Sequence, residues 1–446
     1  MAKKCILILL DGLGDRSFEE LDDLTPLQAA RTPALDQLAR KGANGLYHAA
    51  SLGQALPSEN AHFSLFGYDL DAFPGRGALE ALGAGIPLAP GTVAILAHFV
   101  SVTESPEGTL LLVDGKPDLP DDELKPLFQA VEQFTNESTR IRLHPTHGFR
   151  GILTLDGHVA PFVTDSDPFK KGRPLTAIQT WQAFADDPAS VNTESALKAY
   201  LKWAYHTLSD HPRNRKRREK GRLPLNALVT QRAGQLKAIS AFEHAYGLRG
   251  LSISSGLIYH GLAAYLKMDV RKATDSDDPG HDLAERLEMA MASLADYDFI
   301  HVHTKMPDVA GHTKNPLFKK QVIEALDEGI QKVLERLISD PELLVVVTAD
   351  HSTPSGGPLI HSGEAVPLIF CGPGVRRDAV GNYDEISAAG GALGQVRGKE
   401  LMYLIVNHLD RAKLHGLMDT PIDQPYWPGR AQPFRLREPE KTKDGI

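Results

Sequence analysis

Short runs of consecutive apolar residues recur along the chain, and a polar or glycine-rich turn follows each of them. Val345–Val347 is the clearest case, because consecutive β-branched residues are typical of a strand buried on both faces of a sheet. Cys5–Leu10 and Phe299–His303 have the same character. Other segments, such as His281–Ala295 and Leu317–Ser339, carry apolar residues at helical spacing. This alternation predicts an α/β fold, with a mostly parallel sheet sandwiched by helices.

The pattern changes in the middle of the chain. Gly75–Gly85 is dense in glycine, so we expect the chain to leave the first layer there. From about residue 87 to residue 231, short alternating runs are separated by acidic and proline-rich turns. A chain of 446 residues is also longer than one average core, which favours two domains. We therefore predict a core formed by residues 1–86 and 232–446, and an inserted α+β cap domain at residues 87–231.

Residues that can carry chemistry follow the predicted strands. The carboxyl ends of parallel strands meet at one edge of a sheet, where α/β proteins place ligands. At this edge the sequence predicts Asp11, Ser58, Asp308, His312, Asp350, His351 and His361. Taken alone, Asp350, His351 and His361, which follow Val345–Val347, are equally consistent with a metal site and with a hydrogen-bonded strand end. Contributions from several separate strand ends favour two metal ions that flank a serine.

The residue types suggest a reaction class. Mixed carboxylate and imidazole ligands suit Mn²⁺, Zn²⁺ or Co²⁺ better than Ca²⁺. Two such ions about 4 Å apart stabilise both the entering and the leaving oxygen in phosphoryl transfer. A cation beside Ser58 lowers the pKa of its hydroxyl and makes it a competent nucleophile near neutral pH. Lys305 is suited to neutralise a phosphoryl oxygen.

Composition narrows the classes of partner. The net charge of −9 argues against a nucleic-acid binder, and the basic run His211–Arg222 is better explained as a solvated helix face or loop. No run approaches the roughly 18 apolar residues of a membrane span. The apolar run Cys5–Leu10 is too short for a signal peptide, and Cys5 and Cys371 are expected to be buried thiols. These features predict a cytoplasmic protein.

Longer segments resemble a known family. They read ILLDGLGDR, TPLQAARTPALDQLARKG, PSENAHFSLFGYD, GRGALEALGAGIPL, TDSDP, HPRNRKRREKG with NAL, YGLRG, the K-x-x-D-x-A-G-H segment at Lys305–His312, TADHSTP, LIHSGEAVP and GGALGQVRG. In this order, over nearly the whole chain, they resemble the archaeal-type cofactor-independent phosphoglycerate mutases of the alkaline phosphatase superfamily.

The resemblance implies a ligand set and a reaction. One metal ion would be held by Asp11, Ser58, Asp350 and His351, and the other by Asp308, His312 and His361. Ser58 would be phosphorylated while 3-phosphoglycerate and 2-phosphoglycerate are interconverted without 2,3-bisphosphoglycerate, and Lys305 would assist. The implied cofactors are two divalent ions, in the first place Mn²⁺, with Zn²⁺, Co²⁺ or Mg²⁺ as alternatives.

The expected partner is a small phosphorylated metabolite, phosphoglycerate, rather than nucleic acid or a membrane, and the chain is compatible with a homo-oligomer. Candidate substrate contacts are Arg76, Arg150, Asp165, Asp167 and Arg232. For these residues ordinary roles stay open, such as a structural salt bridge for Arg76 or a turn cap for the two aspartates. His62 is expected to be packed or hydrogen-bonded rather than a ligand. His301 and His303 alternate with Val302 on a predicted strand, so the less favoured interpretation is that one face of this strand approaches the metals.

Several positions depart from the family pattern. The family usually shows G-S-D-T-A-H at the nucleophile, where this chain has PSENAH. Met306 and Pro307 precede Asp308, and the arginine near the second domain connection is displaced by one position, to Arg232. A phosphatase or phosphotransferase of the same superfamily, for example like the homoserine kinase branch, is therefore the alternative. A non-catalytic binding protein is disfavoured because every metal ligand is present.

Overall fold

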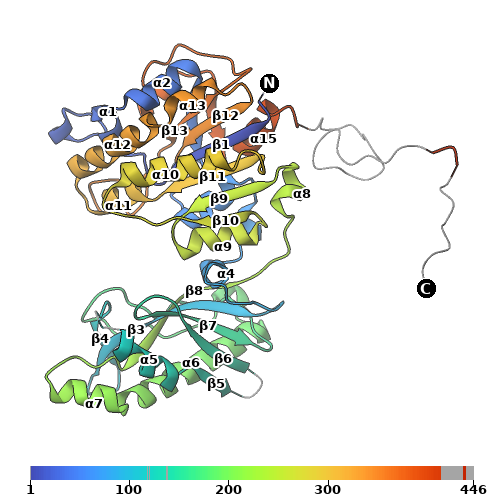
Figure 1. Ribbon diagram of the computed structural model, residues 1–446. Helices are drawn as coiled ribbons and strands as arrows, with labels where there is room; N and C mark the ends of the chain where they lie inside the picture. The colour runs from blue at the N-terminus through green and yellow to red at the C-terminus, as the bar shows by residue number, and fades with distance from the viewer. Residues whose placement is uncertain (1, 118, 120, 137–138, 413–434, 438–446) are drawn as a thin grey trace.

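The computed structural model describes residues 2–117, 119, 121–136, 139–412 and 435–437. Two sheets form its framework, and the smaller lies below the larger in the view of Figure 1. The larger sheet contains, side by side, β10 (Asp269–Lys272), β9 (Gly250–Ser254), β11 (Phe299–Thr304), β1 (Lys4–Leu10), β12 (Leu343–Thr348), β13 (Val366–Cys371), β2 (Ala43–His48) and β14 (Gly394–Arg397). The predicted α/β fold is confirmed.

The centre of the larger sheet is apolar on both faces, as the runs of β-branched and aliphatic residues predict. β1 lies between β11 and β12 and is parallel to both, so that Cys5 pairs with Phe299 on one side and Leu344 on the other. β13 is the exception, because it is antiparallel to β12 and to β2. The loop between β12 and β13 therefore stays at the carboxyl edge of β12, where the candidate ligands gather.

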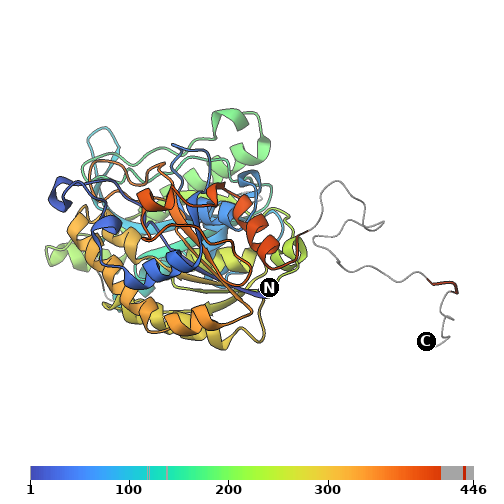
Figure 2. The same ribbon diagram turned by 90° about the horizontal axis from the view of Figure 1, so that it is seen from above.

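Helices cover both faces of this sheet (Figures 1 and 2). The helices associated with it are α1 (Pro26–Ala29), α2 (Pro33–Lys41), α3 (Ser58–Leu65), α4 (Arg76–Gly83), α8 (Phe242–Tyr246), α9 (Leu257–Tyr265), α10 (Pro279–Ala292), α11 (Met306–His312), α12 (Pro316–Gln331), α13 (Leu334–Ser339), α14 (Glu385–Ala388) and α15 (Glu400–His408). The prediction of a single helix at Leu317–Ser339 was wrong in one respect. It is interrupted at Lys332 and Val333, and α13 then packs Leu334 and Leu337 into the core against β12.

The smaller sheet is antiparallel and has its own apolar cluster, which includes Phe99, Leu153 and Tyr200. Its strands are β4 (Leu110–Asp114), β3 (Val93–Glu104), β7 (Arg150–Asp156), β6 (Thr139–Pro145) and β5 (Gln133–Asn136), and β8 (Ala227–Gln235) also pairs with β3. The helices α5 (Asp121–Ala130), α6 (Pro188–Ser209) and α7 (Pro212–Glu219) belong to this part of the chain.

The end of β8 touches the chain just before α4. An added Cβ on Gly75, just before α4, would lie 2.6 Å from the Cα of Gly234 in β8. The residue before α4 and the end of β8 thus lie backbone to backbone. Among the helices of the described ranges, none is both long and apolar enough to cross a membrane. Cys5 and Cys371 are buried free thiols, as predicted.

Glycines bring α4 and α9 into close contact. A Cβ on Gly83 of α4 would lie 1.9 Å from the carbonyl oxygen of Leu257, and one on Gly261 of α9 would lie 1.7 Å from that of Leu79. The glycine-dense segment is therefore a helix whose glycines permit backbone approach, and the chain leaves the first layer only after it.

We expect Gly261→Ala to lower the free energy of unfolding by about 1–3 kcal/mol, because the added methyl group forces α4 and α9 apart. Guanidinium denaturation of the two proteins measures the difference. Gly381→Ala is the control, since a Cβ there would meet no atom within 4 Å. Equal midpoints for Gly261→Ala and Gly381→Ala would contradict this account of the helix contact.

Candidate metal centre

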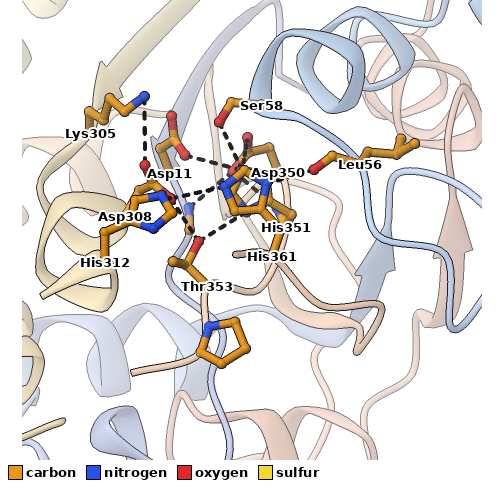
Figure 3. Close-up of polar contacts among 12 residues, drawn as sticks. Asp11, Leu56, Ser58, Lys305, Asp308, His312, Asp350, His351, Thr353 and His361 are labelled. Atoms are coloured by element: carbon orange, nitrogen blue, oxygen red, sulfur yellow. Dashed lines mark hydrogen bonds and ion pairs between the residues drawn. The ribbon is translucent and has the colours of Figure 1, made fainter. Parts of the chain in front are cut away.

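Ser58 is the first residue of α3, and its hydroxyl points at the loop after β12 (Figure 3). Pro57 precedes it in extended conformation, so the chain enters the helix sharply at this point. The Oγ of Ser58 lies 2.9 Å from Nε2 of His351. The first N–H groups of a helix lack partners inside the helix and carry the positive end of its dipole. This end of α3 therefore favours an anion beside the hydroxyl.

Asp11, Asp350 and His351 meet beside Ser58. Nε2 of His351 lies 3.1 Å from Oδ2 of Asp350 and 3.5 Å from Oδ1 of Asp11. Both carboxylate oxygens are buried, and neither has a hydrogen-bond partner among the residues that the structure describes. Buried polar atoms without partners are costly, and convergent ones suit a bound cation. Burial lowers the pKa of His351, which favours the neutral imidazole that a metal ligand requires.

Asp308, His312 and His361 form a second group. Nε2 of His312 and Nε2 of His361 lie 3.2 Å and 3.4 Å from Oδ1 of Asp308. Nδ1 of His361 lies 2.8 Å from the carbonyl oxygen of Leu56, a contact that directs Nε2 toward Asp308. Burial opposes ionisation of Asp308, but the two imidazoles and Lys305 hold the pKa of its carboxyl well below its usual range.

The two groups are adjacent. The structure gathers three sets of side chains whose ligand atoms lie within 4.8 Å of one another, namely Asp308 with His312 and His361, Asp11 with Asp308 and His351, and Asp11 with His62 and His303. The rings of His351 and His361 stack, with centroids 3.8 Å apart. All seven predicted ligands thus gather at one sheet edge, and their carboxylate, imidazole and hydroxyl donors fit two divalent cations.

Residues behind the centre orient Asp11 and Asp350. The hydroxyl of Tyr259 donates to Oδ2 of Asp11 at 2.6 Å, and Nε2 of His303 lies 3.0 Å from the same oxygen. With Oδ2 engaged, Oδ1 is left facing His351. Nδ1 of His62 lies 2.8 Å from the carbonyl oxygen of Ser58 and 3.1 Å from Asp350. His62 is buried and hydrogen-bonded, as predicted, and His303 approaches the centre from the sheet.

Sequence reasoning missed two residues that support the centre, Tyr259 and Lys319. Tyr259 lies on α9, a helix that is apolar on most sides, so nothing in the pattern marks its hydroxyl. Lys319 had a signal, because it occupies the core-facing stripe of α12 with Val322 and Ile323. Its buried ammonium donates to the carbonyl oxygens of Gly12, Gly14 and Thr353 at 2.9, 2.9 and 2.8 Å.

A cavity of about 540 Å³ lies beside this centre and reaches the smaller sheet. Its described lining includes Lys305, which contacts Asp308, and Tyr259, which contacts Asp11, but none of the seven candidate ligands. Four of the five predicted substrate residues also line it, namely Arg76, Arg150, Asp167 and Arg232. Asp165 instead accepts a hydrogen bond from the backbone N–H of Arg232 at 2.6 Å. His98, which sequence analysis did not single out, lines the cavity with Nε2 3.6 Å from Oδ2 of Asp167.

Comparisons with known proteins agree with this centre. The family model of the metalloenzyme superfamily matches residues 3–408. The Methanocaldococcus jannaschii protein named 2,3-bisphosphoglycerate-independent phosphoglycerate mutase 2 is 39% identical over 421 residues, which cover 93% of this chain and 95% of that protein. The 2,3-bisphosphoglycerate-independent phosphoglycerate mutase of Methanopyrus kandleri is 36% identical, over 93% of this chain and 99% of that protein.

Solved structures extend the similarity to the fold. The PH0037 protein of Pyrococcus horikoshii superimposes with a TM-score of 0.76 at 28% identity, covering 94% of this chain and all of that one. The cofactor-independent phosphoglycerate mutase of Thermoplasma acidophilum gives a TM-score of 0.65 at 31% identity, with 91% and 100% covered. This chain therefore belongs to the metalloenzyme superfamily and, within it, to the family of archaeal 2,3-bisphosphoglycerate-independent phosphoglycerate mutases.

We expect Tyr259→Phe to weaken divalent-cation binding about 10- to 100-fold, because Asp11 loses the donor that fixes its orientation. Isothermal titration of chelator-treated protein with Mn²⁺ measures the change. Tyr246→Phe is the matched control, since that hydroxyl bonds to the carbonyl oxygen of Gly67, in the turn after α3. Unchanged affinity in Tyr259→Phe would show that the hydrogen bond does not orient Asp11.

Proposed function

We propose that this protein interconverts 3-phosphoglycerate and 2-phosphoglycerate through a phosphoserine at Ser58, without 2,3-bisphosphoglycerate. The observation that carries the proposal is the position of the Ser58 hydroxyl. It lies at a helix N-terminus, 2.9 Å from His351, beside two carboxylate–imidazole groups. The family membership of the chain supports the same reaction.

We propose the ligand set that the family resemblance implies, and the clustering of these donors at one sheet edge supports it. Asp11, Ser58, Asp350 and His351 would hold one divalent ion, and Asp308, His312 and His361 the other. Mn²⁺ is the proposed physiological ion, with Zn²⁺, Co²⁺ or Mg²⁺ as alternatives that the same donors accept. When bound, such a pair neutralises phosphoryl charge and lowers the pKa of a neighbouring hydroxyl.

The residues of the chain then account for the transfer. Ser58 gives up its proton, and its Oγ bonds to phosphorus while the ester bond to the glycerate breaks and the freed glycerate oxygen takes up a proton. The reverse step uses the other glycerate hydroxyl. Lys305 lies 3.6 Å from Asp308, and the carboxylates of Asp11 and Asp308 outweigh the effect of its burial and raise its pKa. It therefore stays cationic and can bind a phosphoryl oxygen.

The intermediate must be shielded from water, because hydrolysis of the phosphoserine would release phosphate. We propose that residues 87–231 form a cap domain that supplies this shielding, closing the cavity over the glycerate. Arg150 and Asp167 are the proposed contacts of the cap with the substrate. Arg76 and Arg232 are the proposed substrate contacts where the cap meets the core. Asp165 would support Arg232 through the backbone hydrogen bond described above.

We expect Ser58→Ala to reduce mutase turnover at least about a thousandfold, because the nucleophile is lost. Metal content should change little, since most ligands remain. The measurement is a ³¹P NMR time course of Mn²⁺-loaded protein with 3-phosphoglycerate, on aliquots quenched with chelator. Ser105→Ala, in the turn after β3, is the matched control. Retained turnover in Ser58→Ala would exclude the covalent route.

The same time course separates the mutase from its alternative. Growth of the 2-phosphoglycerate signal without inorganic phosphate is the expected result, and inorganic phosphate alone would make the protein a phosphatase.

Removal of divalent ions with chelator should abolish turnover, and re-addition of Mn²⁺ should restore it. Without the ions, the charge of the phosphoryl group is met by Lys305 and nearby arginines, which do not replace two divalent cations. Full activity of the metal-free protein would contradict the proposed centre.

A further inference from the structure

A buried carboxylate follows the nucleophile and has no part in the chemistry described so far. Glu59 lies in the first turn of α3, and only 5% of its surface is exposed. A buried carboxylate is stable only when it is paired. Its two oxygens meet two different arginines. Oε1 lies 2.7 Å from Nη1 of Arg232, and Oε2 lies 3.7 Å from Nη1 of Arg76.

The two arginines reach Glu59 from different parts of the chain. Arg76 begins α4, whereas Arg232 lies on β8, the strand that pairs with β3 of the smaller sheet. Both line the cavity, and their side chains are 31% and 42% exposed. Nε of Arg76 is bonded to Glu80 at 2.6 Å. A guanidinium has five N–H donors, so each arginine keeps donors that can face the cavity.

The backbone of β8 is distorted so that Arg232 takes this position. Ala94 of β3 pairs with Gly234 and Leu96 pairs with Gln231, which leaves Arg232 and Ala233 as a β-bulge opposite Ile95. Arg232 has a φ of 52°, in the left-handed region that side-chain-bearing residues rarely adopt. Its N–H is taken by Asp165 instead of β3. Bulges and strained residues of this kind re-aim side chains at functional sites.

We propose that Glu59 is a positioning residue that holds Arg76 and Arg232 as a paired binding site for the carboxylate of phosphoglycerate. The inference rests on the proposed function. The transferred phosphoryl group belongs at Ser58, so the second anion of the substrate needs a separate cationic site nearby. The cavity that Arg76 and Arg232 line provides it, because Lys305, beside the metal centre, lines the same cavity. Planar guanidinium groups match a carboxylate with parallel hydrogen bonds.

The arrangement also explains the need for Glu59. Two adjacent guanidinium groups repel each other, and a carboxylate between them offsets that repulsion. Because Glu59 follows Ser58 directly in α3, the helix backbone sets the distance from the nucleophile to the carboxylate that holds both arginines. A phosphate ester without a carboxylate would leave the pair without its anion, so this pair gives the cavity its preference for an acid substrate.

The test compares 3-phosphoglycerate with glycerol 3-phosphate, which has a hydroxymethyl group in place of the carboxylate. Dissociation constants of both are measured by isothermal titration on metal-loaded Ser58→Ala protein, in which no transfer occurs. We expect Glu59→Gln to reduce the preference for 3-phosphoglycerate about tenfold, the value of a charge-assisted hydrogen bond. Arg232→Gln, at a half-exposed side chain, should do the same, and combining both should add little further.

Glu123→Gln is the matched control, because Glu123 pairs with Arg217 at 2.6 Å and does not line the cavity. Its preference should equal that of the parent. An unchanged preference in Glu59→Gln, or an equal change for both ligands, would overturn the positioning role. Failure of the proposed function is read separately, as the absence of 2-phosphoglycerate from protein that retains Ser58.

Discussion

The buried ammonium group of Lys319 is the interaction on which the centre depends. Asp11 and Asp350 lie far apart in the sequence, and the pairing of β1 with β12 brings them only as far as the same sheet edge. Beyond the strands, the loops must be held against each other. Lys319 does this by donating to three carbonyl oxygens and pairing with Asp15 at 3.0 Å. A buried cation with all its donors satisfied specifies one arrangement, since any displacement leaves a charge without a partner.

The charges on the two sides of the cavity are complementary. On the core side, beside Lys305 and Tyr259, lie the carboxylates of Asp11, Asp308 and Asp350, which attract cations. Three arginines line the cavity itself, namely Arg76, Arg150 and Arg232. In the proposed reaction, the phosphate ester would place its phosphoryl group at the metal centre and its second anionic group beside the arginines. Such charge separation favours one orientation of the substrate over the reverse.

Much of the centre could be predicted because it lies where strands end. Val345–Val347 and Cys5–Leu10 are unambiguous buried strands, and the residues after them must share an edge. The positions of Tyr259 and His303 depend instead on how α9 and β11 pack, which one-dimensional periodicity does not contain. The β-bulge at Arg232 is equally invisible, because neither glycine nor asparagine marks its left-handed residue. The break between α12 and α13 was missed because the apolar spacing continues across it.

The contact between Gly75 and Gly234 bears on how such a protein can diversify. Because Gly75 and Gly234 lie backbone to backbone, the segment between them, which includes α4 and most of the smaller sheet, begins and ends at nearly one point in space. A segment with adjacent ends can be lengthened, shortened or replaced without separating the strands that hold the reactive groups. Changes of length between Gly75 and Gly234 therefore leave the strands of the larger sheet, and the candidate ligands at their ends, in place.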